Sequence, residues 1–508
     1  MNTAAIYDNA IAGLQYAQAG MVATSQNVTG SNVAGYVRRN PDLLISTMSP
    51  SSTEIGGTAF SVEGFTRNFS SLLQNQLLAQ QSKTSYTATL TQAVSTLDAM
   101  LVDPSASIAK ALGSFFNAAG SLANDPQNPA YQQALIGASL QVGDRIRGLA
   151  ELVDRLKLDS AQGMADVLNQ ANTLAPQLAD VNARIKAASV PGVSYPSGDL
   201  LDERDRITSQ LQQLIGGTTV LNEDGTASYL VDGVQLVDRV RSNQWGGAVN
   251  SKITSDDILN NRVQLLSPGS FGQGGNGILA SDVRLTSFKD GQAGAYALLV
   301  GNFAPTLEKG LNLLAYQLAD KVNSLDGVED IFGFKATSSS QPQVDGWRTL
   351  NIAWPNVNLA NTDFAVLLDR ANPSSLPTYD SLFDQSLQGF DAKTFYARAI
   401  EASGQLANRN MASSSASALA ELRGDFAEPV TFITSSVASS IATWKNNHKT
   451  NEIMSQVLSD QKSAISGVNL DEEAANLVKY QQLYNASSKL IQTNRQMFDT
   501  LLAMLSGN

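Results

Sequence analysis

The chain has 508 residues, and its 34 lysines and arginines against 46 aspartates and glutamates give a net charge of −12. Charged residues make up 16% of the chain, against about 25% in an average soluble protein. Because phosphate binding needs clustered Lys and Arg, this composition argues against a nucleic-acid partner.

Cysteine is absent and His448 is the single histidine. Disulfides, thiolate nucleophiles and cysteine-ligated metals are therefore excluded, and one histidine leaves almost nothing for a zinc site or an acid–base pair. We expect no enzyme activity, no cofactor and no metal. The first basic residue is Arg38, so the N-terminal segment lacks the basic region of a secretory signal peptide, and none is expected. The sequence contains no run of about 18 apolar residues, so no membrane-spanning helix is expected.

The N-terminal segment predicts a helix that ends near Thr29-Gly30, where turn residues gather. Its apolar positions alternate in steps of four and three, the spacing of a coiled-coil seam. This seam comprises Tyr7, Ile11, Leu14, Gln18, Met21, Ser25 and Val28, with the small residues Ala10 and Ala17 beside it.

The C-terminal segment shows the same alternation and begins at a capping residue, Asn469. Asp471, Glu472 and Glu473 lie in the first turn, opposite the positive end of the helix dipole. The seam comprises Leu470, Ala474, Leu477, Gln481, Tyr484, Ser488, Ile491, Arg495, Phe498, Leu502 and Leu505. A lone helix with such a stripe is marginal in water, so we expect the two terminal helices to pair with each other, with other subunits, or with both.

Between the two ends the hydrophobic period changes from helical to β and back. Helices are expected over 69–97, 108–124, 129–158, 161–188, 307–325 and, from about Thr394 onward, mainly over 429–466. Strands are expected over 218–221, 229–237, 263–266, 283–286 and 295–299, and 332–387 is weakly β.

This order predicts a multidomain α+β fold, in which the N- and C-terminal helices pair in a coiled-coil, helical-bundle core with an inserted β-rich outer domain. Three nested units are expected. Residues 1–40 with 467–508 form the terminal coiled coil, 41–195 with 394–466 a helical bundle, and 196–393 the β-rich (α+β) insertion.

Four patterns could carry chemistry, and each has a plainer interpretation. Gly272–Gly277 has the G-x-G-x-x-G spacing, but no strand leads into it and no helix follows, so a flexible loop is expected. His448, flanked by lysines, is expected to be solvated or interhelical. The alternating charges of 202–206 predict the polar face of a helix, and those of 471–473 a helix N-terminus. We find no catalytic constellation.

Several segments resemble flagellar axial proteins. Residues 27–36 resemble the motif that ends the N-terminal helix of rod, hook and hook-associated proteins, with Asn27, Asn32, Gly35 and Tyr36 matching. Ser466–Leu477 is similar to the signature of the hook-associated protein 1 family. The same family is matched by 480–484, 497–502, 199–205 and 318–323. The segment 326–387 resembles nothing that we can name.

The resemblance implies a structural part of the bacterial flagellum at the hook–filament junction, outside the cell and exported by the flagellar type III system without a cleavable signal. Its implied partners are further copies of the chain in a ring or tubular layer, hook protein, other hook-associated proteins and an export chaperone. The terminal helices would form the axial core and fold fully on assembly.

We expect the assembly contacts to lie on the two seams and on the loop motif between them. The residues are Ile11, Leu14, Met21, Val28, Asn32, Gly35, Tyr36, Leu470, Leu477, Tyr484, Ile491, Phe498 and Leu502. Two alternatives stay open: another axial protein, such as hook-associated protein 3, hook protein or flagellin, and an exported axial protein that carries a hydrolase insert.

Overall fold

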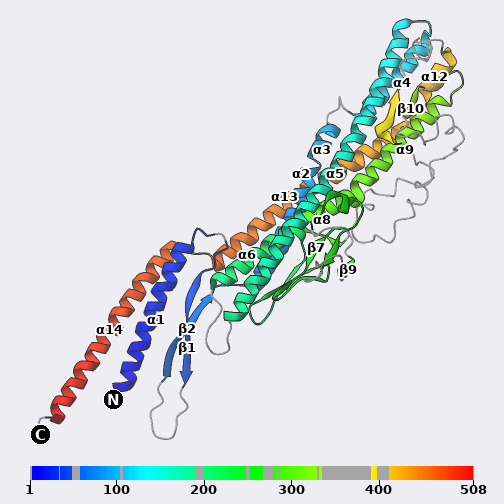
Figure 1. The fold of residues 1–508 in the computed structure, drawn as a ribbon. Helices are drawn as coiled ribbons and strands as arrows, with labels where there is room; N and C mark the ends of the chain where they lie inside the picture. The colour runs from blue at the N-terminus through cyan, green and yellow to red at the C-terminus, as the bar shows by residue number, and fades with distance from the viewer. Residues whose placement is uncertain are drawn as a thin grey trace.

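The computed structural model describes residues 3–33, 35–47, 58–102, 107–188, 198–247, 252–266, 279–282, 287–328, 331–334, 391–397 and 411–506. The molecule is elongated (Figure 1). Both chain ends lie at one end, a helical body extends to the other, and small sheets lie along one side of the body.

The terminal region is a pair of long helices with a β ribbon beside it. Helix α1 (Thr3–Gly30) packs along α14 (Leu470–Ser506), while β1 (Arg39–Thr47) and β2 (Thr58–Arg67) form an antiparallel ribbon that contacts α1 (Figure 1). The expected end of the first helix at Gly30 is confirmed. Asn469 caps α14 as expected, because its side-chain oxygen accepts a 3.0 Å hydrogen bond from the Asp471 amide. The ribbon was not expected from the sequence.

The body is built on helices that run along its length. They are α2 (Ser71–Ala93), α3 (Ser95–Val102), α4 (Ile108–Asn124), α5 (Pro129–Ala188), α9 (Ala304–Asn323), α12 (Ser413–Glu421) and α13 (Arg423–Ser466). The expected helix 69–97 is interrupted at Val94, whereas the expected helices 129–158 and 161–188 are one continuous helix, α5. Ser160 and Ala161 are both buried and continue the helical spacing of the buried face, so the helix does not end between the two expected segments.

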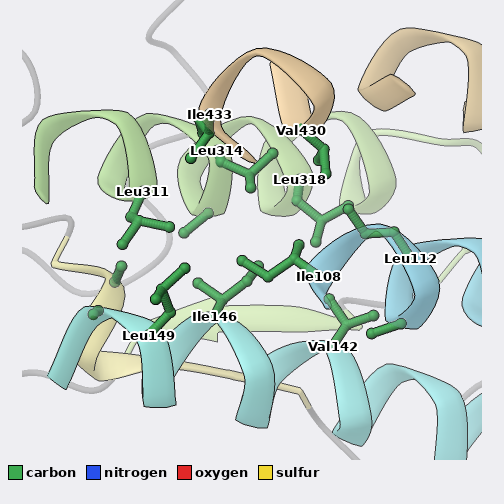
Figure 2. Packing of buried hydrophobic residues seen from close by; sticks show 14 of the residues in the cluster. Ile108, Leu112, Val142, Ile146, Leu149, Leu311, Leu314, Leu318, Val430 and Ile433 are labelled. Atoms are coloured by element: carbon green, nitrogen blue, oxygen red, sulfur yellow. The ribbon is translucent and has the colours of Figure 1, made fainter. Parts of the chain in front are cut away.

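One hydrophobic core lies between α4, α5, α9 and α13 (Figure 2). Leu112, Ile146, Leu318 and Val430 meet there from four different helices. Phe115 is fully buried in the same core, with its ring centroid 5.2 Å from that of Phe116 and 5.3 Å from that of Phe332. Burying one such side chain contributes about 1.5–3 kcal/mol, so this core holds the helices of the body together.

A second core lies between the C-terminal half of α5, α6 (Gly198–Ile215) and two small sheets. The first sheet has the order β3 (Thr218–Leu221), β4 (Ala227–Val231), β5 (Val234–Asp238) and β6 (Arg241–Ser242). The second has the order β7 (Gln244–Gly246), β8 (Gln264–Leu266) and β9 (Leu279–Asp282), with the short helix α7 (Ser255–Leu259) between β7 and β8 in the chain.

Two strand predictions in this part are wrong. The expected strand 229–237 is a hairpin, because Asp232 and Gly233 both have positive φ (49° and 82°) and reverse the chain in a tight turn between β4 and β5. The expected strand 295–299 is helical: α8 (Gly291–Leu298) continues through a π-helical turn (Leu299–Phe303) into α9. A short apolar run does not by itself distinguish a buried strand from a buried helix.

The remaining elements are short. Strands β10 (Phe332–Phe334) and β11 (Phe395–Ala397) pair antiparallel, and a 3-10 turn (Ala392–Thr394) precedes β11. Residues 392–397 are therefore not the start of an α-helix, and the next helix among the described residues is α12. The expected strand 283–286, the glycine loop 272–277 and most of 332–387 lie outside the described residues. Within the described part of the chain, we find no helix whose length and hydrophobicity would let it cross a membrane.

Candidate assembly interface

The two terminal helices meet along a row of residues spaced seven apart on each helix. On α1 the row is Gly13, Gly20 and Asn27; on α14 the facing residues are Ser487, Tyr480 and Glu473. The numbers rise on one helix as they fall on the other, so the helices are antiparallel. We call this the pairing row; on α14 it continues to the buried Asn494.

Gly20 is required by the close approach of Tyr480. A Cβ at Gly20 would overlap the Tyr480 ring, and the Tyr16 ring lies edge-on to that ring with centroids 5.8 Å apart. Burial raises the pKa of Tyr480 to about 12, with Tyr16 adding to the shift. The pair is therefore held at this level by one aromatic residue that fits against a glycine backbone.

The face of α1 that is buried in the pair is made of small or polar side chains. Ala10, Ala17 and Thr24 are buried beside the pairing row, as are Ala23 and Asn27. Such side chains let two backbones approach closely but bury little apolar area. The pair therefore gains less from the hydrophobic effect than a leucine-lined coiled coil of the same length.

The large apolar residues of the predicted seams lie beside the pairing row rather than in it. On α14, Leu470, Leu477, Tyr484, Ile491 and Phe498 are spaced by sevens and follow the pairing row by four residues. Leu470 is 55% exposed and Phe498 56% exposed, while Tyr484 and Ile491 are partly covered.

On α1, Leu14, Met21 and Val28 also repeat every seven residues and each follows a pairing-row residue by one. Val28 is 42% exposed, and Leu14 and Met21 are partly exposed. In an antiparallel pair of right-handed helices with about 3.6 residues per turn, these offsets fall on the same side of the pair. We call this combined surface the outer apolar face, and it comprises Leu14, Met21, Val28, Leu470, Leu477, Tyr484, Ile491 and Phe498.

The other sequence-predicted residues lie outside this face. Ile11 lies further round α1 and is partly exposed, and Leu502 is 49% exposed near the end of α14. In the loop after α1, Asn32 and Gly35 are exposed, and Gly35 takes a positive φ of 86°. The structure therefore brings eight of the thirteen predicted residues onto one surface and distributes the rest around it.

Tyr36 has a structural role at the base of the pair. Its hydroxyl donates a 2.9 Å hydrogen bond to Asn27 Oδ1, which also accepts the Arg39 amide at 2.9 Å. Asn27 Nδ2 donates to the Arg39 carbonyl at 3.0 Å and to Glu473 Oε2 at 3.1 Å. Asn27 thus connects α1, the start of the ribbon and α14, and burial raises the pKa of Tyr36 to about 12.

A cluster of charges, most of them buried, joins this base to the body, and the sequence did not predict it. Its arginines come from the start and end of the ribbon, and its carboxylates come from α6 and α14. Arg38 lies 2.6 Å from Glu472 and 2.8 Å from Glu473; Arg39 lies 2.6 Å from Asp199 and 3.0 Å from Asp202; Arg67 lies 2.6 Å from Asp202 and 2.7 Å from Asp205. We call this set the ionic joint.

The ionic joint sharpens the interpretation of 202–206 as the polar face of a helix, because much of that face is buried. Asp202, Arg204 and Asp205 have side chains only 4–13% exposed, and burial raises the pKa of Asp202. Glu203 and Arg206 do form the expected exposed pair, and the Arg206 guanidinium lowers the pKa of Glu203. Of the three acidic residues that open α14, Glu473 is buried and bonded, so it does more than face the helix dipole.

His448 was expected to be either solvated or between helices, and it lies between helices. Its ring Nδ1 is 3.4 Å from the Thr87 hydroxyl, so it faces α2 from α13. Among the residues described, no cluster of histidine and carboxylate side chains is arranged to hold a metal ion.

Comparison with known proteins aligns nearly the whole chain with relatives that share one name. The chain is 26% identical over 550 residues to flagellar hook-associated protein 1 of Escherichia coli (strain K12), covering 98% of this chain and 99% of the relative. The protein of the same name from Salmonella typhimurium is 25% identical over 564 residues with the same coverage. Residues 94–328 match the family described as "Flagellar hook-associated protein FlgK helical domain". The chain is similar over nearly its full length to flagellar hook-associated protein 1.

A second family model matches the C-terminal part of the chain. Residues 461–504, which include most of α14, match the family described as "Flagellar basal body rod FlgEFG protein C-terminal". A solved structure titled "The structure of the flagellar hook junction protein FlgK from Burkholderia pseudomallei" aligns with 52% of this chain and 47% of that one, at 24% identity and a TM-score of 0.43. The match to the rod-protein family covers the helix that carries most of the outer apolar face.

Proposed function

We propose that the chain is a structural component of the bacterial flagellum that forms the junction between hook and filament and assembles through the outer apolar face. One observation carries this proposal. Apart from the Tyr480 ring, the terminal helices pair through small and polar side chains, and they leave most of their large apolar side chains partly or largely exposed. Contiguous exposed apolar surface of this kind marks a protein–protein contact.

The family supplies the partners in this proposal. Relatives over nearly the full length carry the name hook-associated protein 1, which supports contacts with hook protein, with other hook-associated proteins and with further copies of the chain in a ring or tubular layer. The same resemblance supports type III export without a cleavable signal, an extracellular location and an export chaperone that holds α14 before secretion. The same relatives support a structural role rather than a catalytic one.

The experiment is a double substitution on the outer apolar face. Leu477→Asp with Phe498→Asp places two charges where a neighbour would bury apolar area, and each buried leucine or phenylalanine is worth about 1.5–3 kcal/mol. We expect the variant protein to keep a folded body but to abolish motility and filament attachment. The readouts are swimming assays and electron microscopy of the cells.

A matched control carries the same number of new charges on the same helix. Gln482→Asp with Gln496→Asp alters two exposed positions that lie away from the outer apolar face. Normal motility is expected from the control. Normal filaments in the Leu477→Asp, Phe498→Asp variant would contradict the proposed role of the face. Immunogold labelling along the hook or the filament, instead of at their boundary, would favour another axial protein.

A further inference from the structure

The body contains a cavity of about 460 Å³ where α5 passes the junction of α2 and α3. Its lining residues come from α2, α3, α5 and α8, and include Gln92, Leu97, Leu156 and Tyr296. None of the residues that line it belongs to the outer apolar face, the pairing row or the ionic joint. Its volume lies within the range of about 300–1,000 Å³ that is typical of small-molecule sites.

Two helices depart from regular α geometry beside this cavity. Helix α2 ends at Val94, between the lining residues Gln92 and Thr96. Helix α8 passes into the π-helical turn three residues after Tyr296, which also lines the cavity. Single π turns inside helices are frequent at functional sites, so the place of the cavity in the fold is typical of a binding site.

Ser160 of α5 lines the cavity with an unpaired hydroxyl. The residue is 1% exposed, and among the described residues its Oγ has no hydrogen-bond partner. In the same group of helices, the hydroxyls of Thr87, Thr91 and Ser139 each donate to a carbonyl of their own helix. Because an unpaired buried hydroxyl lowers stability, Ser160 indicates a partner that the described part of the chain does not supply.

Tyr296 adds a second hydroxyl to the same wall. Its ring packs against the backbone of α5 at Gly163, where a Cβ would overlap it, three residues beyond Ser160. Within the described residues, the Tyr296 hydroxyl makes no hydrogen bond. Burial raises the pKa of Tyr296, and Asp166 adds to the shift, so this group remains a neutral phenol that can donate.

Arg155 and Asp159 bring one positive and one negative charge to the cavity. They are four residues apart on α5, a spacing that makes two side chains neighbours on a helix surface. In the described part of the chain, neither of them forms an ion pair. Both are exposed, so the cavity can be reached from solvent at this point, and the two charges sum to zero.

We propose that this cavity binds a small zwitterion with an apolar side chain, the chemistry of a free α-amino acid such as leucine or phenylalanine. Arg155 pairs with the carboxylate of the ligand and Asp159 with its ammonium group. The hydroxyls of Ser160 and Tyr296 supply further hydrogen bonds. The inference goes beyond the proposed function and does not depend on it.

The lining residues select this class of ligand over simpler ones. A phosphate or a fatty acid carries no group for Asp159, and a polyamine carries none for Arg155. The aliphatic side chains of Leu97, Leu152 and Leu156 line the same cavity and can cover an apolar side chain of the ligand. A ligand that lacks one of the two charges or the apolar side chain should therefore bind more weakly.

The experiment is a set of ligand-detected NMR titrations on the purified full chain. The probes are L-leucine, L-phenylalanine and three compounds that each lack one feature. 4-Methylpentanoate lacks the ammonium group, leucinamide lacks the carboxylate, and glycine lacks the apolar side chain. We expect saturable binding of at least one of the two amino acids, and binding at least about tenfold weaker for each of the three incomplete compounds.

Two substitutions assign the two charges of the ligand. Arg155→Gln should weaken the binding of the amino acid about tenfold but leave the affinity for leucinamide unchanged, because leucinamide has no carboxylate to lose. Asp159→Asn should weaken the amino acid similarly and leave the affinity for 4-methylpentanoate unchanged. A merely structural role for either residue would weaken all probes alike. Circular dichroism checks that each variant keeps its helix content.

The same helix offers a matched control. Asp180 and Arg184 are also exposed and four residues apart on α5, but they lie outside the cavity. Asp180→Asn and Arg184→Gln should therefore bind the amino acid as the natural chain does.

Three results would overturn the proposal. No saturable binding of either amino acid up to about 10 mM would reject the site. Equal affinities for the amino acid and the three incomplete compounds would reject recognition of a zwitterion. Binding that is unchanged by both Arg155→Gln and Asp159→Asn, or weakened equally by the two control substitutions, would show that the amino acid does not bind in this cavity. Each of these results would leave the proposed role of the outer apolar face untouched.

Discussion

The helical body and the terminal pair use apolar side chains in opposite ways. In the body, Phe115, Phe303 and Leu318 are fully buried between helices, and polar residues face outward. In the terminal pair, glycine, alanine and serine lie between the helices while leucine and phenylalanine face outward. The body therefore completes its own core, whereas the terminal pair offers most of its hydrophobic area to something else.

This difference also separates two kinds of interhelical contact. The body is stabilised by buried hydrophobic area. The loss in its free energy of unfolding when a side chain is truncated should therefore follow the apolar area that the side chain buries. The terminal pair is positioned by specific features, namely the close approach at Gly20, the Asn27 hydrogen bonds and the ionic joint. Its stability should depend on those few residues and hardly at all on its outward-facing leucine and phenylalanine side chains.

The sharpest test compares one large side chain from each region. Phe115→Ala opens a cavity in the body core and should lower the free energy of unfolding by about 3–5 kcal/mol. Leu477→Ala removes an outward leucine of the terminal pair and should change it by less than about 0.5 kcal/mol. Urea denaturation of both purified variants measures the two values. Equal losses would show that the outer face is part of an intramolecular core.

The ionic joint should be sensitive to the loss of one buried charge. Asp202→Asn leaves Arg39 and Arg67 with one fewer carboxylate in a buried site and should cost about 1.5–3 kcal/mol. Glu203→Gln, on the next residue of the same helix, breaks an exposed pair with Arg206 and should cost less than about 1 kcal/mol. Thermal unfolding compares the two. A larger loss from Glu203→Gln would overturn the assignment of the joint.

The close approach at Gly20 should tolerate no large side chain. Gly20→Leu drives a side chain into the Tyr480 ring, and we expect a net loss of about 1–2 kcal/mol after the better helix propensity of leucine is included. Hydrogen exchange of the backbone amides of α1 close to Asn27 measures this loss. Adding Tyr480→Ala should restore much of the protection, because the overlapping ring is gone. A double variant no better than Gly20→Leu would mean that the ring is not what excludes a side chain.

The smallest expected effect is a response to alkaline pH. Burial raises the pKa of Tyr480 to about 12, above its value of about 10 in an unfolded chain. The folded state thus holds this proton more tightly, so the stability linked to it is present below about pH 10 and is lost as pH rises toward about 12. Circular dichroism over this range should show a smaller loss of helix for Tyr480→Phe than for the natural chain. Identical curves would show that the phenol does not contribute.

Much of the architecture could be predicted from the sequence, because the long helices carry strong helical periodicity. The ends of α1 and the cap of α14 were found because turn residues and Asn469 act locally. The hairpin at Asp232-Gly233 was missed although Asp-Gly is a turn signal, because the strand pattern on both sides was taken as one run. The helical stretch 295–299 was missed because a short apolar run has no period to measure.

The sequence could indicate which residues form the apolar stripes of the terminal helices, but not which side of each helix faces the other helix. The heptad spacing of Leu477 and Met21 predicts two stripes, but it leaves open whether they contact each other, other subunits or both. The structure places Gly20 and Tyr480 where the helices meet, and a single glycine carries no periodic signal. The ionic joint could not be predicted, because Arg39, Arg67 and Asp202 are far apart in sequence and only the fold makes their charges neighbours.

The continuity of helix α5 determines how stiffly the two hydrophobic cores are connected. One helix of 60 residues supplies side chains to both hydrophobic cores, with 135–156 in the first and 161–185 in the second. At about 1.5 Å per residue it is about 90 Å long. Two cores joined by a flexible linker would tilt independently under load. Because both cores are built on one continuous helix, they move together when the molecule is bent or twisted. A torque applied at the terminal end is therefore transmitted to the far end of the molecule.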